Sequence, residues 1–259
     1  MVLVTGAAGR IGSVLRQAWG EQFGVVRLVD TRDLGEPAAN EEVLRLDLAD
    51  FEAARRAVEG VDVVVHLAAV AREERFGSLL EANVVATYNV FEAARRCDVR
   101  RIVFASTNHV TGFYRRGERV TPSDPVRPDS LYAVTKVFGE ALGRLYADKC
   151  GLEVVCLRIG SFGERPTSVH ELTMWLSHRD AVQLFSKAVS APGIGFLVVY
   201  GMSRSRWSSW ENPGAAEIGF APVDDADVAA DEQVKREADA KADPLQGGSY
   251  TDRDYWYGP

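Results

Sequence analysis

The sequence contains few cysteines, and none is placed to form a disulfide framework. Cys97, Cys150 and Cys156 are the three cysteines among 259 residues, and no two of them form a CxxC pair. Secreted domains held by disulfides, and zinc sites built from cysteine, both need more cysteines at closer spacing. We therefore expect no disulfides, no metal site and a reducing, cytoplasmic environment.

Long apolar runs and an excess of positive charge are also absent. No stretch approaches the roughly 18 apolar residues of a membrane-spanning helix. A strand-like run begins at Val2, which leaves no room for a signal peptide. The formal net charge is -7, whereas proteins that grip nucleic-acid phosphates carry clustered Lys and Arg. We expect a soluble protein whose partner is neither a membrane nor a nucleic acid.

The chain does contain a regular alternation of patterns. Short runs rich in Val, Leu and Ile alternate with helix-period segments over residues 1–160. Such alternation is typical of βαβ units, so we predict an α/β fold with a doubly wound parallel sheet of the Rossmann type. The strands are expected at residues 2–5, 25–30, 43–47, 61–67, 101–106, 153–159 and 196–200.

Local signals predict helix starts and the organisation of the later part of the chain. Asp50 and Ser130 are placed to cap the helices that follow them. Residues 169–189 have the pattern of one helical stretch. Residues 224–243 are acidic and rich in alanine, which predicts an exposed helix or a mobile segment. The final stretch includes residues 246–248, and its last ten residues hold three tyrosines and a tryptophan. We expect this stretch to pack on the body of the protein or on a second subunit of a homo-oligomer.

A glycine-rich turn links the first strand to the first helix. Gly6, Gly9 and Gly12 have a GxxGxxG spacing. In dinucleotide-binding folds the first glycine permits a tight turn, the second lets a pyrophosphate approach the backbone, and the third lets helix and strand pack closely. The turn, including Arg10 and Ile11, is therefore the predicted phosphate site.

The residue that ends the second strand predicts which dinucleotide is bound. Asp30 follows the glycine turn by about 20 residues, where a carboxylate accepts hydrogen bonds from the adenosine ribose. It would repel the 2′-phosphate of NADP, whereas Arg32 would attract it. Because Thr31 rather than a basic residue directly follows Asp30, we predict NAD. Asp47 and Leu48, at the end of the third strand, are predicted to border the adenine.

Tyr132 and Lys136 are the candidate catalytic pair. They are four residues apart on one predicted helix and therefore share a face. A phenol is a poor base near neutral pH, but a lysine ammonium and the positive charge of an oxidised nicotinamide both favour the phenolate. Tyr132 would then accept a proton from a substrate hydroxyl as hydride leaves, and Lys136 would also hold the nicotinamide ribose. Gly139 and Gly143 share the face of Tyr132 and Lys136. Another face of this helix carries an apolar stripe of Leu131, Val134, Phe138, Leu142 and Leu145.

Polar residues follow the strand expected at residues 101–106. Thr107, Asn108 and His109 stand at the carboxyl edge of the sheet, where open α/β sheets bind ligands. The Thr107 hydroxyl is predicted to polarise the reacting oxygen beside Tyr132. Asn108 and His109 are predicted to hydrogen-bond sugar hydroxyls.

Taken together, these features resemble the NAD-dependent epimerase/dehydratase family, the extended short-chain dehydrogenases. The resemblance rests on the glycine turn, Asp30, the HLAA run at residues 66–69, Asn83, Thr107 and the YxxxK motif, and it spans nearly the whole chain. It implies further cofactor contacts at Leu67, Ala68, Ala69, Asn83 and Ile159.

Within this family, several segments resemble the uronate dehydrogenases, which oxidise C1 of a hexuronate to its lactone. The resemblance implies Tyr132 as the base, Lys136 as its partner and Thr107 in the place of a catalytic serine. It adds Ser161 to Asn108 and His109 as a substrate contact. The segments are residues 101–109, 131–136, 158–161, 174–178 and 246–248.

Two positions depart from the uronate dehydrogenase pattern. Ala71 stands where a substrate-binding serine is expected, and His170 stands where an arginine would hold the uronate carboxylate. Losing a guanidinium removes the best partner for a planar carboxylate. A phosphate or sulfonate at C6, as in glucose 6-phosphate or a 6-sulfonated hexose, is therefore an alternative, with Arg72, Arg75, Arg165 and His170 as candidate ligands.

Two other functions are alternatives. A nucleotide-sugar epimerase or dehydratase would use the same glycine turn and Tyr/Lys pair. However, we predict an NAD-binding domain over residues 1–160 and a small substrate-binding cap with the C-terminal segment, integrated with it, over residues 161–259, which is short for a nucleotide diphosphate. A catalytically idle NAD-sensing module is the second alternative, which the presence of Thr107, Tyr132 and Lys136 disfavours.

Overall fold

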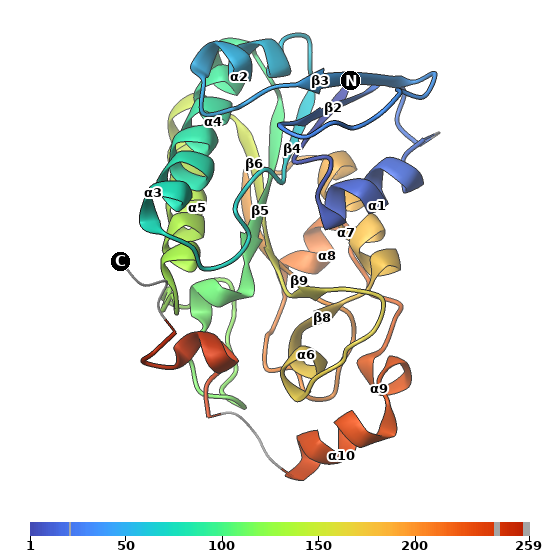
Figure 1. Ribbon diagram of the computed structural model, residues 1–259, viewed down its shortest axis with the longest axis vertical. Coiled ribbons are helices and arrows are strands. Elements are labelled where there is room, and N and C mark those ends of the chain that lie inside the picture. Colours follow the sequence, from blue (N-terminus) through green and yellow to red (C-terminus); the bar gives the residue numbers. More distant parts are fainter. Residues whose placement is uncertain (21, 241–243, 256–259) are drawn as a thin grey trace.

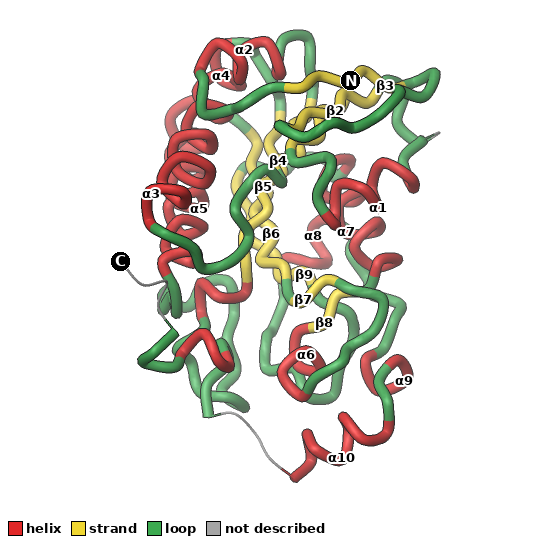
Figure 2. Tube along the Cα trace, viewed as in Figure 1, coloured by secondary structure: helices red, strands yellow, loops and turns green. Residues whose placement is uncertain are grey.

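The structure is a computed structural model that describes residues 1–20, 22–240 and 244–255. A parallel sheet of seven strands runs through its centre in the order β3-β2-β1-β4-β5-β6-β9 (Figures 1 and 2). The strand order reverses between β1 and β4, which is the switch point where doubly wound sheets bind dinucleotides. The strands are β1 (Val2–Thr5), β2 (Val26–Asp30), β3 (Glu41–Arg45), β4 (Val63–His66), β5 (Arg101–Thr107), β6 (Glu153–Ile159) and β9 (Phe196–Gly201).

Helices cover both faces of this sheet, and a buried apolar core fills each layer (Figure 1). The predicted α/β fold with a doubly wound parallel sheet is confirmed. One face carries α2 (Phe51–Val58), α4 (Ala86–Arg96) and α5 (Leu131–Cys150), and the other carries α1 (Arg10–Ala18), α7 (His178–Ser190) and α8 (Gly214–Ile218). Shorter helical turns are α3 (Phe76–Leu79), the π-helical η1 (Leu80–Val85), and the 3-10 turns η2 (Asn108–Thr111) and η3 (Gly248–Thr251).

The two predicted helix caps are confirmed. The Asp50 carboxylate accepts hydrogen bonds from the N–H groups of the first turn of α2. Ser130 Oγ accepts the N–H of Ala133 at 3.2 Å and so begins α5. These side chains satisfy N–H groups that have no partner within the helix. As a result, Tyr132 lies in the first turn of α5.

The stretch predicted as a single helix over residues 169–189 is instead interrupted, which corrects the prediction. It forms α6 (Val169–Met174), the two-residue strand β8 (Trp175–Leu176) and α7. β8 pairs with β7 (Ser161–Phe162). Ser177 Oγ accepts the N–H of Asp180 at 3.0 Å and starts α7 as a new helix.

The apolar stripe of α5 is buried only in part. Val134 and Leu145 are 48% and 47% exposed, while the face that carries Tyr132 and Lys136 lies against the sheet. Two glycines on that face permit the approach, since a Cβ at Gly139 would lie 2.2 Å from the Phe104 ring. The glycine face therefore brings the helix close to β5 and β6.

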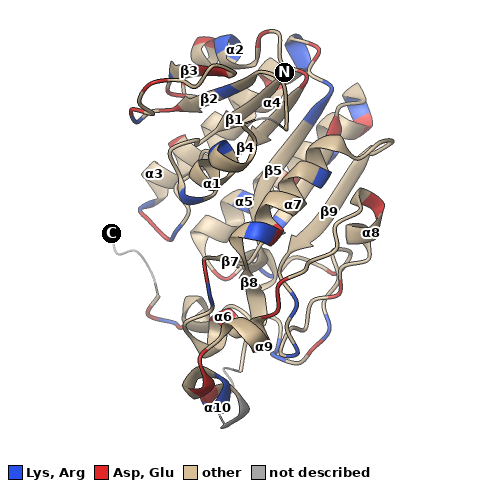
Figure 3. Ribbon diagram, turned by 90° about the vertical axis from the view of Figure 1, so that its right-hand side faces the viewer, with Lys and Arg blue, Asp and Glu red and all other residues tan. Residues whose placement is uncertain are grey.

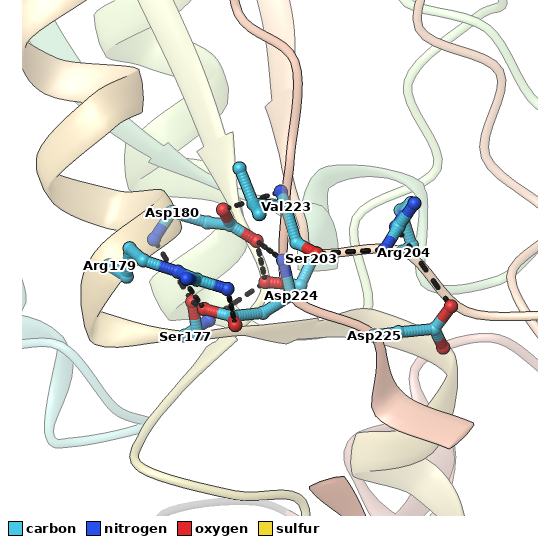
Figure 4. A network of polar contacts seen from close by, with 8 residues as sticks. All are labelled: Ser177, Arg179, Asp180, Ser203, Arg204, Val223, Asp224 and Asp225. Carbon is cyan, nitrogen blue, oxygen red and sulfur yellow. Dashed lines mark hydrogen bonds and ion pairs between the residues drawn. The ribbon is translucent and has the colours of Figure 1, made fainter. Parts of the chain in front are cut away.

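A buried carboxylate anchors the segment that leads to the cap helices. Asp180 accepts hydrogen bonds from Ser203 Oγ at 2.6 Å and from the N–H groups of Val223 and Asp224 at 2.8 and 3.1 Å (Figure 4). Asp224 accepts a further hydrogen bond from Ser177 Oγ at 2.5 Å. These contacts tie residues 223–224 to the start of α7.

The cap lies beyond the carboxyl ends of the strands and contains β7, β8, α6, α9 (Ala226–Ala229) and α10 (Glu232–Ala240) (Figure 1). The acidic segment predicted over residues 224–243 forms α9 and α10, and its last three residues lie outside the described part of the chain. Acidic and basic residues are interspersed along the ribbon in Figure 3. Within the described ranges, no helix is long and apolar enough to cross a membrane.

Candidate active site

The glycine turn between β1 and α1 is shaped by close backbone contacts. Gly6 has a φ of +68°, and a Cβ at this position would lie 2.7 Å from the backbone nitrogen of Ala68. A Cβ at Gly12 would lie 2.6 Å from the Gly6 carbonyl oxygen. α1 begins after Gly9 without a side-chain cap, so the N–H groups of its first turn are available to a pyrophosphate. The turn has the shape that a dinucleotide requires.

Arg10 and Ile11 follow the turn and face the body of the protein. The Arg10 guanidinium donates to the carbonyl oxygen of Phe162 and lies 5.8 Å from the centre of its ring. Ile11 packs against the apolar core. Their contribution to a phosphate site would therefore come from the backbone, while the Arg10 side chain ties α1 to β7.

Asp30 ends β2 and borders the glycine turn. Its carboxylate accepts the N–H of Ala8 at 2.9 Å through Oδ2 and the N–H of Arg32 at 3.0 Å through Oδ1. The Arg32 Nε also lies 3.3 Å from Oδ1. The carboxylate thus stands beside the predicted phosphate site, with a guanidinium against it.

The remaining predicted cofactor residues take different places. Leu67, Ala68 and Ala69 follow β4 beside the glycine turn, and Ala68 N–H donates to Thr5 Oγ1 at 3.2 Å. Asn83 lies in η1 and exchanges hydrogen bonds of 2.8 and 3.0 Å with the backbone of Val70. Asn83 therefore holds the loop after β4 in place.

At the adenine end, β3 stops two residues earlier than predicted. Asp47 consequently lies in a turn, where its Oδ1 accepts the N–H of Ala49 at 3.0 Å. Leu48 is buried in the core between the sheet and α2. Ile159 ends β6 in the other core, at the carboxyl edge of the sheet.

The end of β5 and the first turns of α5 bring the candidate catalytic residues together. Thr107, Tyr132 and Lys136 are 4%, 8% and 4% exposed. Lys136 Nζ lies 5.8 Å from the centre of the Tyr132 ring and 5.1 Å from that of Phe104. The three side chains form a compact group beneath the edge of the sheet.

Burial determines the protonation of this group. It raises the pKa of Tyr132 to about 12, an effect that the Thr107 side chain opposes. Burial also lowers the pKa of Lys136 to about 7. The neighbouring His66 has its pKa lowered to about 3, first by burial and then by the charge of Lys136. The site disfavours charge on all three residues, so a bound cation or new hydrogen bonds would change their protonation strongly.

Asn108 and His109 follow Thr107 in η2 and have partners outside it. Asn108 Nδ2 donates to the sulfur of Met174 at 3.3 Å. His109 Nδ1 lies 2.7 Å from Oδ2 of the buried Asp129. The His109 ring stacks on Tyr250 with a centroid distance of 4.1 Å. The prediction that the C-terminal segment packs on the body of the protein is confirmed for residues 246–250, and residues 256–259 lie outside the described part.

His170 lies at the other side of this region, on α6. It lines a small cavity with Trp207, Trp210 and Gln246. A Cβ at Gly248 would lie 2.8 Å from His170 Nδ1, so the C-terminal segment passes directly over the imidazole. The position that departs from the uronate dehydrogenase pattern is thus enclosed by the cap and the chain end.

The other predicted substrate residues are less enclosed. Ser161 Oγ, in β7, donates to Glu171 Oε1 at 3.0 Å. Arg72 and Arg165 are 73% and 59% exposed and pair with neighbouring carboxylates. Arg75 is also exposed. Asn108 and His109 directly follow Thr107, and His170 lies under the C-terminal segment that also covers His109, whereas these arginines are on the surface.

Two buried carboxylates and one tyrosine at the site were not predicted from the sequence. Glu73 accepts the N–H of Tyr132 at 2.9 Å and that of Leu131 at 3.3 Å. Asp129 accepts hydrogen bonds from His109 and from Ser130 Oγ. Tyr250 stacks on His109. A signal existed for Asp129, which directly precedes a helix cap, but Glu73 lies in a charged stretch that has the pattern of a surface loop.

Comparisons with known proteins place this geometry in a family. Residues 2–179 match the NAD dependent epimerase/dehydratase family. The chain belongs to that family. The match includes the glycine turn and the Tyr132/Lys136 pair, and it confirms the predicted family and its NAD dependence.

Sugar dehydrogenases are among the similar proteins. Uronate dehydrogenase of Pseudomonas putida is 40% identical over 96% of this chain and 94% of that protein. A mutant of uronate dehydrogenase from Agrobacterium tumefaciens, solved with NAD, matches with a TM-score of 0.90 and 38% identity over 98% of each chain. NAD-dependent glucose-6-phosphate dehydrogenase of Haloferax volcanii is 34% identical over 87% of this chain and 94% of that protein.

Proposed function

We propose that this protein is an NAD-dependent dehydrogenase that oxidises C1 of a hexuronate to the aldonolactone. The observation that carries the proposal is the convergence of Thr107, Tyr132 and Lys136 at the carboxyl edge of the sheet, beside the glycine turn. Similarity to uronate dehydrogenases over nearly the whole chain supports it. Membership of an NAD-dependent family supports NAD as the cofactor.

The residues around the glycine turn would hold the dinucleotide. The N–H groups that follow Gly9 would bind the pyrophosphate, and the Asp30 carboxylate would accept hydrogen bonds from the adenosine ribose. Lys136 would donate to the nicotinamide ribose. Those ribose hydroxyls would solvate the Lys136 ammonium, which burial otherwise discharges near pH 7.

Tyr132 would accept the proton of the C1 hydroxyl. When bound, NAD supplies the acceptor for the C1 hydride and, in its oxidised form, a positive charge. A phenol with a pKa of about 12 requires such positive charge, together with the Lys136 ammonium, to act as a base. The Thr107 hydroxyl would hydrogen-bond the C1 oxygen as its bond to carbon becomes double.

The groups around the sugar ring suit a small polyhydroxylated substrate. The Asn108 amide can donate to and accept from ring hydroxyls. Asp129 holds His109 Nδ1, which leaves Nε2 for a substrate hydroxyl. Ser161, whose Oγ donates a hydrogen bond to Glu171, would be a third contact with the sugar.

A tetrahedral anion at C6 is a second candidate, favoured by His170. An imidazolium makes single hydrogen bonds and lacks the two-pronged geometry that selects a planar carboxylate. The similar glucose-6-phosphate dehydrogenase supports this alternative. Arg72, Arg75 and Arg165 would contribute only after turning in from the surface.

The test is a panel of sugars oxidised with NAD and followed by the absorbance of the reduced nicotinamide. It contains glucuronate, galacturonate, glucose 6-phosphate, a 6-sulfonated glucose and unmodified glucose at matched concentrations. A highest kcat/KM for a uronate supports the proposal, and a highest value for the phosphate or sulfonate supports the second candidate. Highest activity with uncharged glucose, or activity with a nucleotide sugar alone, would contradict both.

We also propose that the two parts of the chain act as an NAD-binding domain, residues 1–160, and a substrate-binding cap, residues 161–259. We infer that the protein is a cytoplasmic homo-oligomer. Exposed apolar side chains on the adjacent helices α4 and α5, including Tyr88, Val134 and Leu145, support self-association. Light scattering on the purified protein tests the subunit number.

A further inference from the structure

The carboxylate of Asp30 already accepts hydrogen bonds from groups of the protein itself. One oxygen accepts the Ala8 N–H, and the other accepts the Arg32 N–H and lies 3.3 Å from the Arg32 guanidinium. The residue is 8% exposed, whereas the Arg32 side chain is 63% exposed. The negative charge at the end of β2 is therefore partly neutralised by an exposed cation.

A second arginine lies on the neighbouring strand. Arg45 ends β3 directly opposite Asp30 in the parallel register. Its Nε donates to the Thr31 carbonyl oxygen at 2.8 Å, and none of the described carboxylates pairs with it. Arg32 and Arg45 thus lie on the two segments that flank the Asp30 carboxylate.

We propose that Arg32 and Arg45 form a site for the 2′-phosphate, so that the protein accepts NADP in addition to NAD. This inference rests on the proposed use of a dinucleotide and not on the identity of the sugar. A carboxylate without cationic neighbours would repel a 2′-phosphate, but here the repulsion is offset by two groups that favour phosphate geometry.

The weak Arg32–Asp30 contact makes an exchange of partners feasible. An ion pair with one exposed member contributes little to stability, so its loss opposes ligand binding only slightly. Arg32 can turn from Asp30 to the phosphate, while Asp30 keeps the N–H of Ala8. With NAD, Arg32 stays on Asp30 and the carboxylate receives the ribose hydroxyls.

The experiment measures binding of NADH and NADPH without any sugar, through the fluorescence of the reduced nicotinamide. The variants are Arg32→Gln and Arg45→Gln, with Arg119→Gln as the matched control, because Arg119 is exposed and pairs with Glu211 away from the glycine turn. The Kd of the unmodified protein for NADPH should lie within about tenfold of its Kd for NADH, since one charge-assisted contact corresponds to roughly that factor.

The two variants should affect the binding of NADPH and NADH differently. Arg32→Gln should weaken NADPH binding by about tenfold or more and NADH binding by less than about threefold. Arg45→Gln should act in the same direction, and Arg119→Gln should alter neither. NADPH binding should also weaken more steeply with added salt than NADH binding.

Two results would overturn the site. One is NADPH binding more than about a hundredfold weaker than NADH binding in the unmodified protein, and the other is an equal loss of both dinucleotides in Arg32→Gln. Either result leaves the proposed function intact, because NADH still binds. If the unmodified protein bound neither NADH nor NADPH, the 2′-phosphate site and the proposed function would both be overturned.

Discussion

Glu140 and Arg158 form a two-pronged ion pair between α5 and β6, with both nitrogen-to-oxygen distances at 2.9 Å. Glu140 is one helical turn beyond Lys136, and Ser106 Oγ donates to it at 2.6 Å. Arg158 also donates to the Tyr200 hydroxyl at 3.1 Å. The pair fixes the position of α5, which carries Tyr132 and Lys136, against the sheet.

Removing one member of this pair should destabilise the protein strongly. Glu140→Ala leaves the Arg158 guanidinium buried without its counter-charge, which should lower the free energy of unfolding by about 3–5 kcal/mol. Urea denaturation measures the change. Glu140→Leu combined with Arg158→Met should recover most of the loss, and a double variant as unstable as Glu140→Ala would contradict this account.

Tyr132→Phe should remove catalysis and retain cofactor binding. The ring still fills its site, but the acceptor for the C1 proton is gone, so kcat should fall by at least about 10². Steady-state kinetics with the best sugar of the panel measures kcat, and NADH fluorescence should show binding within a few-fold of the unmodified protein. Near-normal turnover would show that another group is the base.

Glu73 should act as a positioning residue for Tyr132. Its carboxylate binds the N–H groups of Leu131 and Tyr132, so Glu73→Ala releases the first turn of α5 from the loop after β4. We expect kcat to fall on the order of tenfold, because small misplacement of a reacting group is costly, while KM for NAD stays within about twofold.

Glu73→Gln is the matched control, since its amide oxygen still accepts one of the two hydrogen bonds. It should retain most of the activity. A loss of kcat in Glu73→Ala that is matched by an equal rise in KM for NAD would point to general unfolding of the site instead.

Lys136→Met should stabilise the protein at neutral pH and abolish its activity. The pKa of Lys136 is 10.5 in the unfolded chain and about 7 in the folded protein. The unfolded state therefore binds more protons between pH 7 and 10.5, and the contribution of Lys136 to stability rises with pH across that window.

The stability gain of Lys136→Met should accordingly be greatest at or below pH 7, on the order of a few kcal/mol, and should shrink as the pH approaches 10.5. Denaturation of both proteins at several pH values measures this difference. A gain that does not depend on pH would mean that Lys136 keeps its ordinary pKa in the folded state.

Features that depend on short-range patterns were predictable from the sequence. The strands, the glycine turn, the Asp50 and Ser130 caps and the placement of Tyr132 near Lys136 all follow from local periodicity and spacing. The break between α6 and α7 was not predicted, because the helical pattern of apolar residues continues across Ser177.

Contacts between distant segments were not predictable in the same way. Glu73 reaches α5 across 59 residues, and Tyr250 reaches His109 only because the cap turns the chain end back over η2. The face of α5 that carries Tyr132 and Lys136 was predicted from the sequence, but its burial depends on the fit of Gly139 against Phe104. A sequence pattern does not encode such a three-dimensional fit.

The path of the chain end has a consequence for the order in which the two binding sites form. Gly247 lies so close to Asp129 that a Cβ there would stand 2.1 Å from its carboxylate, and its N–H donates to the Gly112 carbonyl oxygen at 2.8 Å. The sheet and the glycine turn are complete long before these residues leave the ribosome. A nascent or clipped chain without residues 244–255 would thus keep the glycine turn and Asp30 but lack the segment that covers His109 and His170.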